Sequence, residues 1–466
     1  MQKNELIRFR ITDINNLGVG VGHLENAGEQ TGMTVFVRGG VTGDELEVKV
    51  IKITKGYLVA RIERTLVPSP YREERDLCDA ALSCGGCAYR HVSYAHELEI
   101  KRGYVQNAFR KMGLSDVTVL PTRSTGVVCG YRNKAQYPVQ KGKDGKTVAG
   151  FYANASHRVV SAEHCALQPP VFSEIVAFLC DFCDRYGISA YDEKTGKGLL
   201  RHIYLRIGVK TGEIMVCPVV NGRSLPHERE LTEQITARFP NIKCLILNFN
   251  TKSTNVVLGE SYRLLAGRPY IEDELCGLTF RISPEAFYQV NHDACELLYG
   301  LAKEKAALTG KELLLDLYCG IGSIGLSMAD RAGEVLGMEI VEGAARCAEE
   351  NAKRNGIKNA AFFCGDASDS QGLLKTAMEK KGDLSGAVCV IDPPRKGTTP
   401  ELIEGIAAHR IPRVVYVSCN PDTLARDCAE FRRLGYQIGE VTPVDLFPRT
   451  GHVESVVCLK RQSDVI

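Results

Sequence analysis

Residues 313–325, LLLDLYCGIGSIG, decide the class of fold. A short apolar run is followed by glycines that match G-x-G-x-x-G, beginning at Gly320 and ending at Gly325. Such glycines permit a tight turn and let a ligand approach the backbone N–H groups that open the next helix. Glu339 lies 19 residues after Gly320, at the end of a second apolar run, where a carboxylate can accept hydrogen bonds from ribose hydroxyls. Two nucleotide ligands remain open at this point, namely NAD and S-adenosylmethionine (SAM).

Further apolar runs place this motif in a sheet. Residues 313–317, 334–337, 387–391 and 414–417 are nearly continuous apolar runs, and helical stretches lie between them. Strands that are buried on both faces have this composition, and alternating strands and helices imply a largely parallel sheet. We therefore predict a C-terminal α/β domain, doubly wound and Rossmann-like, over residues 283–466.

The rest of the chain predicts two further domains. Residues 1–64 contain short β-prone runs separated by Gly-rich turns, which indicate a small β-barrel of the OB type. Such barrels commonly bind oligonucleotides, although a β module without a ligand has the same pattern. Residues 65–282 mix helical and strand-like runs, including a helical stretch at about 92–112, and carry a cysteine cluster. They predict a central α+β domain, so that the protein is multidomain.

Composition excludes several classes of protein. The 466 residues carry 58 Lys and Arg against 56 Asp and Glu, a net charge of +2, and 44% of them are hydrophobic. This composition excludes disorder and collagen, and 18 cysteines are too few for a disulfide scaffold. The chain starts without the pattern of a signal peptide and has no apolar run long enough to span a membrane. We therefore expect a cytoplasmic protein with reduced thiols, working as a monomer.

Two loops near the end of the chain carry further polar groups. One apolar run ends in DPPR (392–395) and the next in SCNP (418–421). Ligands of open α/β sheets bind outside the carboxyl ends of the strands, so both loops and the glycine turn should meet at one crevice. A rigid turn would explain each loop by itself, but it does not explain three such loops in order on one sheet.

At these positions the sequence resembles the RNA uracil-5-methyltransferases, which modify uridines in ribosomal or transfer RNA. The resemblance rests on residues 316–325, DPPR at 392–395, SCNP at 418–421, HVE at 452–454 and FYQVN at 287–291. It covers nearly the whole chain, and residues 1–64 look like a TRAM domain. SCNP followed by HVE is specific, whereas the glycine motif and DPPR occur in many other methyltransferases. The resemblance implies that the nucleotide ligand is SAM.

The chemistry of such a reaction needs a thiolate and a base. Carbon 5 of uracil is too weak a nucleophile to attack a methyl sulfonium, but a thiolate that adds to carbon 6 converts the ring to an enolate. A base must then remove the carbon-5 proton so that the thiolate can leave. The resemblance implies that Cys419 is the nucleophile and Glu454 the base. A buried thiol and a surface carboxylate are the ordinary alternatives for these residues.

Residues that contact SAM are likewise carried over from the family. They are Gln289, Tyr318, Glu339 and Asp392, and an aromatic ring at Tyr318 suits stacking against adenine or the sulfonium. Asp366 is expected to meet the adenine edge, although capping a helix is an alternative. Asp392 can serve the cofactor, the uracil edge or both.

Four cysteines form a candidate metal site. Cys78, Cys84 and Cys87 lie close together, and Cys165 is the candidate for a fourth ligand. Thiolates at this spacing suit zinc or an iron–sulfur cluster, but zinc ribbons usually have two C-x2-C pairs where this sequence has one. The spacing resembles the 4Fe–4S site of the family, which implies a 4Fe–4S cluster. Some relatives lack the site, so the absence of any metal is a third alternative.

Local charge and aromatic residues indicate an RNA partner. Residues 123–160 contain seven Lys and Arg against one Asp, and residues 194–210 contain five Lys and Arg and no acid. A solvated face is the ordinary explanation of each run. The candidate platforms on which unpaired bases would stack are Tyr131, Tyr137, Phe151 and Tyr152.

The sequence thus predicts SAM-dependent methylation of carbon 5 of a uridine, with 23S ribosomal RNA as the expected substrate and transfer RNA as the alternative. The rival enzyme is an NAD-dependent oxidoreductase, which leaves SCNP and the N-terminal barrel unexplained. The non-catalytic rival is an iron–sulfur RNA-binding protein with a decayed transferase domain. Intact Cys419, Glu454 and Asp392 speak against decay.

Overall fold

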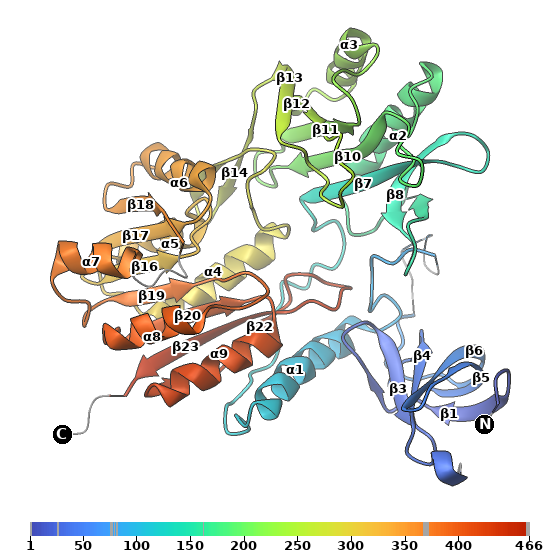
Figure 1. Ribbon diagram of the computed structural model, residues 1–466, viewed down its shortest axis with the longest axis horizontal. Coiled ribbons are helices and arrows are strands. Elements are labelled where there is room, and N and C mark those ends of the chain that lie inside the picture. The colour runs from blue at the N-terminus through green and yellow to red at the C-terminus, as the bar shows by residue number, and fades with distance from the viewer. Residues whose placement is uncertain are drawn as a thin grey trace.

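The computed structural model describes residues 2–25, 28–74, 78, 80, 83–161, 163–366 and 372–462. In this part of the chain the strands form three large sheets and one hairpin. Figure 1 shows the C-terminal sheet at the left, the central sheet at the upper right and the N-terminal sheet at the lower right. Over the same described ranges, no helix combines the length and the apolar character needed to cross a membrane.

The N-terminal sheet has six strands in the order β1-β5-β6-β4-β3-β2. Its core comes from alternate residues, such as Leu46, Val48 and Val50 of β5, whose neighbours are partly or fully exposed. The β5–β6 ladder shifts register at three places, and bulges of this kind bend and twist a sheet. The strands are β1 (Leu6–Arg10), β2 (Asp13–Ile14), β3 (Val19–His23), β4 (Thr34–Arg38), β5 (Glu45–Ile53) and β6 (Tyr57–Val67).

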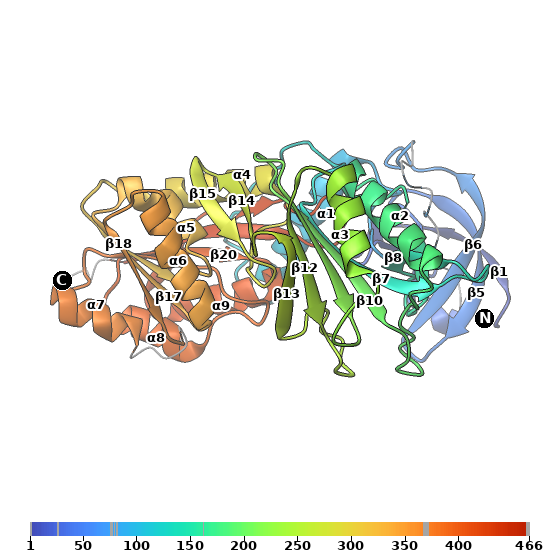
Figure 2. The ribbon, with the colours of Figure 1, turned by 90° about the horizontal axis from the view of Figure 1, so that it is seen from above.

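The central sheet has seven strands in the order β13-β12-β11-β10-β7-β8-β9. Helices α2 (Pro170–Arg185) and α3 (Glu228–Arg238) cover one face, on which Val216 packs. The adjacent residues Met215 and Cys217 face the other side and join the core of the C-terminal domain. In the view from above, this sheet lies between the C-terminal domain and the N-terminal sheet (Figure 2). The strands are β7 (Lys134–Lys141), β8 (Thr147–Tyr152), β9 (Val159–Ser161), β10 (Leu200–Ile207), β11 (Ile214–Val220), β12 (Ile242–Phe249) and β13 (Ser261–Gly267).

The C-terminal sheet has the order β18-β17-β16-β19-β20-β23-β21, with β22 paired to β23. The first five strands run parallel, and β23 runs antiparallel to β20. The strands are β16 (Leu313–Leu317), β17 (Glu334–Glu339), β18 (Ala360–Cys364), β19 (Val388–Ile391), β20 (Arg413–Ser418), β21 (Tyr436–Ile438), β22 (Thr442–Val444) and β23 (Glu454–Arg461). The helices are α4 (His292–Ala306), α5 (Ser323–Met328), α6 (Glu342–Arg354), α7 (Leu373–Lys381), α8 (Pro400–Ala408) and α9 (Pro421–Arg433).

Both faces of the C-terminal sheet are buried, because successive residues of its strands enter two different cores. Leu314 and Val390 pack with α4, α5, α6 and the hairpin β14 (Ile271–Leu275) and β15 (Leu278–Ile282). Leu315 and Ile391 pack with α7, α8 and α9 on the opposite face. This double cover explains why the strands read as continuous apolar runs.

Helix α1 (Tyr94–Lys111) is the helix that the sequence predicts at about 92–112. Although it precedes the central sheet in the chain, its Val105 and Phe109 pack in the same core as α9. The hairpin β14–β15 also packs with the C-terminal sheet rather than with the central one. The predicted central segment, 65–282, therefore contributes structure to the C-terminal domain as well, which Figure 1 shows for α1.

The strand order places a crevice at one edge of the C-terminal sheet. The chain passes from β16 outward to β18 and then returns to β19, on the other side of β16. Loops that leave neighbouring strands in opposite directions open a crevice outside the carboxyl ends of those strands. The end of β16 and the end of β19 flank this switch point.

Candidate active site

A cavity of about 640 Å³ lies outside the carboxyl ends of the parallel strands. Each of the five parallel strands supplies one sequence-predicted residue at its end or within two positions beyond it. These are Tyr318 (β16), Glu339 (β17), Asp366 (β18), Asp392 (β19) and Cys419 (β20). Gln289, before α4, and Glu454, the first residue of β23, also line the cavity. The structure therefore brings together all seven residues that the sequence nominates for cofactor binding and catalysis.

The glycine turn after β16 is fixed by two carboxylates. Gly320 has a φ of +57°, a left-handed conformation that glycine adopts without strain. Its N–H donates to Glu339 Oε2 at 3.0 Å, while Glu339 Oε1 accepts the N–H of Val341 at 2.9 Å. At the far end of the turn, Gly325 donates to Asp316 Oδ2 at 2.8 Å, and a Cβ on Gly325 would lie only 2.6 Å from that oxygen. The turn and the Glu339 carboxylate thus hold each other in place.

The loops after β19 and β20 are bonded to each other. Asn420 caps helix α9 by accepting the N–H of Asp422 at 3.1 Å, and its Nδ2 donates to the carbonyl of Arg395 at 2.9 Å. Asp427 of α9 accepts the N–H of Thr398 at 2.9 Å. One helix therefore positions both the loop that carries Asp392 and the loop that carries Cys419.

Strand register brings Cys419 and Glu454 together. Ser418, the last residue of β20, pairs with Ser455 of the antiparallel strand β23. Cys419 directly follows β20, and Glu454 directly precedes Ser455 in β23, so the two face each other across the end of this ladder. Glu454 is buried and Cys419 half-buried, so a partly accessible thiol lies beside a sheltered carboxyl group.

Burial governs the protonation of these groups. It raises the pKa of Glu454 to about 8, with a contribution from Asp392, and it raises the pKa of Asp392 to about 7. Burial, followed by the charges of Glu454 and Asp392, raises the pKa of the Cys419 thiol to about 11. Arg395 opposes the shifts at Glu454 and Cys419, since a nearby cation favours both anions. Burial therefore favours the neutral thiol of Cys419 and the neutral carboxyl group of Glu454.

The sequence does not single out every residue of this cavity. Phe447 lines it from the loop between β22 and β23, and its ring meets that of His452 edge-on, with centroids 5.8 Å apart. His452 and Arg395 belong to the quoted motifs, but the sequence assigns neither of them a role. The signal that could have identified Phe447 is weak: it is an aromatic residue shortly before HVE, in a segment without a periodic pattern.

The four candidate metal ligands lie apart from this cavity. Cys78, Cys84, Cys87 and Cys165 line a second cavity of about 290 Å³. The loop of Cys84 is bound to the central sheet, because Gly85 donates to the carbonyl of Tyr152 at 3.0 Å. In the described parts of the chain, no three His, Cys, Asp or Glu side chains are grouped so that they could hold a single metal ion.

The two basic stretches differ from the sequence prediction. In residues 194–210, Arg201 and Arg206 are buried and donate to backbone carbonyls, including those of Asn250 and Ala286 at 2.7 Å each. Of the five cations in this stretch, only the three lysines are exposed, so the predicted surface of five cations is wrong. From sequence, a lysine or arginine in a strand is expected to be exposed, because the distant carbonyl groups that can accept its hydrogen bonds in the folded protein cannot be recognised.

Two of the predicted stacking platforms are also unavailable. Tyr131 and Tyr137 are buried in the core, so they cannot stack on RNA bases. Phe151 and Tyr152 remain partly exposed. In residues 123–160, five of the seven cations are exposed, namely Arg123, Lys141, Lys143, Lys146 and Arg158.

Two family models match this chain. Residues 224–462 match the tRNA (uracil-5-)-methyltransferase model, and residues 2–62 match the TRAM domain. The chain is 38% identical to an uncharacterized RNA methyltransferase of Bacillus cereus, over 99% of this chain and 98% of the relative. It is 39% identical to an uncharacterized RNA methyltransferase of Halalkalibacterium halodurans, with the same coverage of the two chains.

A solved structure is similar over almost the whole chain. It is the crystal structure of Pyrococcus abyssi tRNA (uracil-54, C5)-methyltransferase in complex with S-adenosyl-L-homocysteine. The match has a TM-score of 0.75 and 28% sequence identity, and it covers 97% of this chain and 99% of that chain. The similarity therefore includes all three sheets and not only the nucleotide-binding one.

Proposed function

Because this chain belongs to the tRNA (uracil-5-)-methyltransferase family, we propose that it methylates carbon 5 of one specific uridine through a covalent adduct of Cys419. The predicted TRAM domain, methyltransferase fold and SAM-dependent RNA (uracil-5-)-methyltransferase activity are confirmed by the family relationship. The NAD-dependent oxidoreductase and the non-catalytic RNA-binding protein do not fit it. The juxtaposition of Cys419 and Glu454 in the wall of the large cavity carries the proposal about mechanism.

The residues at the carboxyl edge fit SAM. The turn at Gly320 brings backbone close to the cavity, and each oxygen of Glu339 keeps a lone pair free for a ribose hydroxyl after accepting one N–H. We propose that Tyr318 stacks on the cofactor, that Asp366 meets the adenine edge, and that Gln289 and Asp392 complete the binding site. When bound, SAM supplies the methyl group.

The chain's own residues then act on the uracil ring. Cys419 and Glu454 first lose their protons to solvent. The Cys419 thiolate then adds to carbon 6, and the electron pair of the carbon 5–carbon 6 bond becomes an enolate that is nucleophilic at carbon 5. After methyl transfer, Glu454 takes the proton from carbon 5, the double bond re-forms, and the carbon 6–sulfur bond breaks to release the thiolate. Arg395 favours the ionised forms of both groups. The target base must leave its stack to reach Cys419, so an unpaired or opened segment is the expected RNA structure.

Two substitutions test the roles of Cys419 and Glu454. Cys419→Ala should form neither a covalent complex with RNA nor a product. Glu454→Gln should form the covalent complex with RNA and transfer the methyl group, and it should then fail to release the methylated RNA. Denaturing gel electrophoresis with labelled RNA distinguishes them, because only a covalent complex survives detergent.

A matched control for the first substitution is Cys276→Ala, an exposed cysteine outside the cavity, which should keep full activity. If the Cys419→Ala variant still turned over substrate, Cys419 would be excluded as the nucleophile. Normal product release by Glu454→Gln would mean that another group removes the proton.

We propose that the RNA substrate is 23S ribosomal RNA, as the sequence resemblance implies. Transfer RNA is the second candidate, because the similar solved structure is that of an enzyme named for uridine 54 of tRNA. Mapping 5-methyluridine in both RNAs from cells with and without this protein decides between them. A 5-methyluridine that disappears only from tRNA would contradict the ribosomal assignment.

We also propose that Cys78, Cys84, Cys87 and Cys165 hold a 4Fe–4S cluster rather than zinc. A zinc ion needs all its thiolates about 2.3 Å from one point. A cluster takes its thiolates around a larger inorganic core. The four thiols line one cavity, and their spacing in the sequence resembles the 4Fe–4S site of the family. Methyl transfer moves no net electrons, so such a cluster would serve folding or the RNA contact.

Purification without oxygen tests this site. The protein should then contain iron and sulfide, and Cys84→Ser should lose both and become more sensitive to proteolysis in the central segment than in the C-terminal domain. Cys129→Ser, at a thiol that lines an adjoining cavity, is the matched control and should keep its iron. Zinc without iron or sulfide would contradict the cluster and leave the methyltransferase unaffected.

Further proposals concern the organisation of the protein. We propose that the protein works as a monomer. An RNA substrate favours the cytoplasm. The division into domains at residues 1–64, 65–282 and 283–466 remains a prediction.

A further inference from the structure

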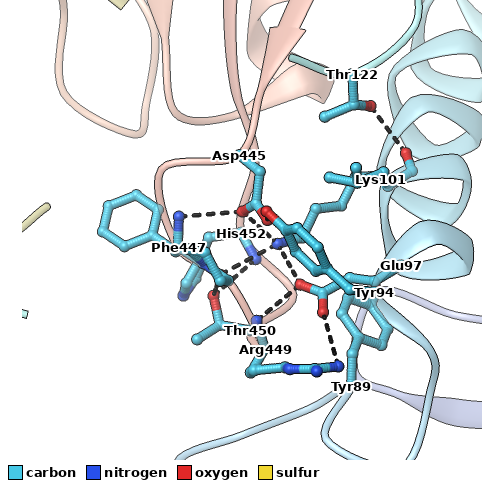
Figure 3. Close-up of polar contacts among 12 residues, drawn as sticks. Tyr89, Tyr94, Glu97, Lys101, Thr122, Asp445, Phe447, Arg449, Thr450 and His452 are labelled. Atoms are coloured by element: carbon cyan, nitrogen blue, oxygen red, sulfur yellow. Dashed lines mark hydrogen bonds and ion pairs between the residues drawn. The ribbon is translucent and has the colours of Figure 1, made fainter. Parts of the chain in front are cut away.

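A lysine is buried on helix α1, far in sequence from the catalytic residues. The side chain of Lys101 is 1% exposed, and its Nζ donates to Glu97 Oε1 at 2.8 Å and to Asp445 Oδ1 at 2.6 Å. Its third donor reaches the carbonyl of Phe447 at 3.1 Å. All three N–H groups of the ammonium therefore have partners, and two of these partners, Asp445 and Phe447, lie in the loop before β23 (Figure 3).

Lys101 belongs to a buried cluster of charged groups. Glu97 and Asp445 are fully buried, and both pair with Lys101. Arg449 Nη1 lies 3.7 Å from Glu97 Oε2, while its Nη2 pairs with Glu73 at 2.7 Å. Tyr94 donates its hydroxyl to Asp445 Oδ2 at 2.9 Å. Glu97 Oε2 accepts no hydrogen bond, but the other carboxylate oxygens of the cluster and all three donors of Lys101 are bonded. A buried ion pair with this many hydrogen bonds fixes geometry more than it adds stability, so this cluster is suited to hold a loop in one conformation.

The loop in question joins two strands of the active site. Both polar backbone groups of Phe447 form hydrogen bonds with the cluster. Its N–H donates to Asp445 Oδ1 at 3.1 Å, and its carbonyl accepts a hydrogen bond from Lys101. Thr450 Oγ1 donates to the same carbonyl at 2.8 Å. The side chain of Phe447 lines the cavity that also holds Cys419 and Glu454.

The N-terminal half of the molecule holds the other side of this loop. The carbonyl of Arg449 accepts the N–H groups of Ala88 and Tyr89 at 2.9 and 3.1 Å. Gly451 packs so closely on the backbone of Asn16 that a Cβ there would lie 1.7 Å from its carbonyl oxygen. The loop is thus fixed on its outer side by backbone contacts and on its inner side by Lys101.

We propose that Lys101 is a positioning residue: with Glu97 and Asp445 it fixes the Phe447 ring in the wall of the catalytic cavity, where the ring holds the target uracil against Cys419. This inference rests on the proposed function. An aromatic ring can stack on a base that has left the RNA helix, and the addition step needs carbon 6 close to the sulfur. The effect of Lys101 on the reaction is therefore expected to pass through Phe447.

The test is a double-mutant cycle measured on formation of the covalent RNA complex. Lys101→Met should slow adduct formation by about ten- to a hundredfold, since a shift of about 1 Å in a reacting group can cost that much. SAM affinity, measured by calorimetry, should be unchanged. In a Phe447→Ala background, Lys101→Met should have almost no further effect on the rate.

Two further variants make the result decisive. Lys111→Met, on the exposed end of the same helix, is the matched control and should react at the wild-type rate. Tyr94→Phe removes one hydrogen bond to Asp445 and gives a milder perturbation if Lys101→Met does not fold. Its smaller rate loss should also vanish when Phe447 is Ala.

Additive effects of the two substitutions, or a wild-type rate for both Lys101→Met and Tyr94→Phe, would overturn the proposal. If wild-type protein itself forms no covalent complex with any RNA, the proposed function fails instead. The two failures are therefore distinguishable in the same experiment.

Discussion

The affinity for SAM provides a quantitative test of the nucleotide site through Glu339→Ala. The Glu339 carboxylate accepts N–H groups of Gly320 at 3.0 Å and Val341 at 2.9 Å, which orient it toward the cavity. Alanine removes the acceptor proposed for the ribose hydroxyls. A hydrogen bond to a charged group contributes about 1.5–3 kcal/mol, so SAM affinity should fall about ten- to a hundredfold.

Isothermal titration calorimetry measures this loss directly. Glu342→Ala is a matched control, because it removes an exposed carboxylate three positions away, in the first turn of α6, and should leave SAM binding unchanged. Thermal unfolding of Glu339→Ala without SAM shows how much the glycine turn itself depends on the carboxylate. Wild-type affinity in Glu339→Ala would refute the assignment of the ribose site, whatever the change in thermal stability.

Three other outcomes are expected. Release of RNA from the preformed covalent complex should accelerate about tenfold per pH unit up to about pH 8 and then level off. The reason is that burial raises the pKa of Glu454 to about 8 and only the ionised form of Glu454 takes a proton. A release rate that does not change with pH would count against Glu454 as the base. Gly325→Ala should lower the free energy of unfolding by about 1–3 kcal/mol, because its Cβ would press on Asp316. Gly343→Ala, in open space on α6, should be neutral or slightly stabilising, and equal denaturation midpoints for the two would contradict the packing argument. Asn420→Ala should lower the free energy of unfolding by about 0.5–2 kcal/mol in the same denaturation assay, because helix α9 loses its cap. It should also slow adduct formation, because the loop after β19 loses its hydrogen bond to Asn420. An unchanged adduct rate would mean that the bond between Asn420 and the Arg395 carbonyl does not position the site.

The nucleotide edge of the sheet could be predicted from sequence because its signals are local. Each parallel strand is a continuous apolar run, and the residue that follows it must lie at the carboxyl edge, as Asp392 and Cys419 do. Buried charges could not be predicted in the same way. Lys101 meets Asp445 across 344 positions of the chain, and Arg206 finds its acceptors on a loop 80 positions away. Before those partners are known, a charged residue in a helix or strand is expected at the surface.

The direction of a single strand accounts for the pairing of Cys419 with Glu454, the proposed nucleophile and base. In a sheet of parallel strands only, the first residue of a strand lies at the amino edge, the full length of the strand away from the loops that bind ligands. Because β23 runs antiparallel to β20, its first residue, Glu454, lies at the carboxyl edge beside Cys419. The same reversal brings the loop before β23 to that edge, and with it Phe447. Substitutions that weaken the contacts of this loop should therefore disturb the reaction with RNA while leaving intact the SAM contacts proposed at the ends of β16 and β17.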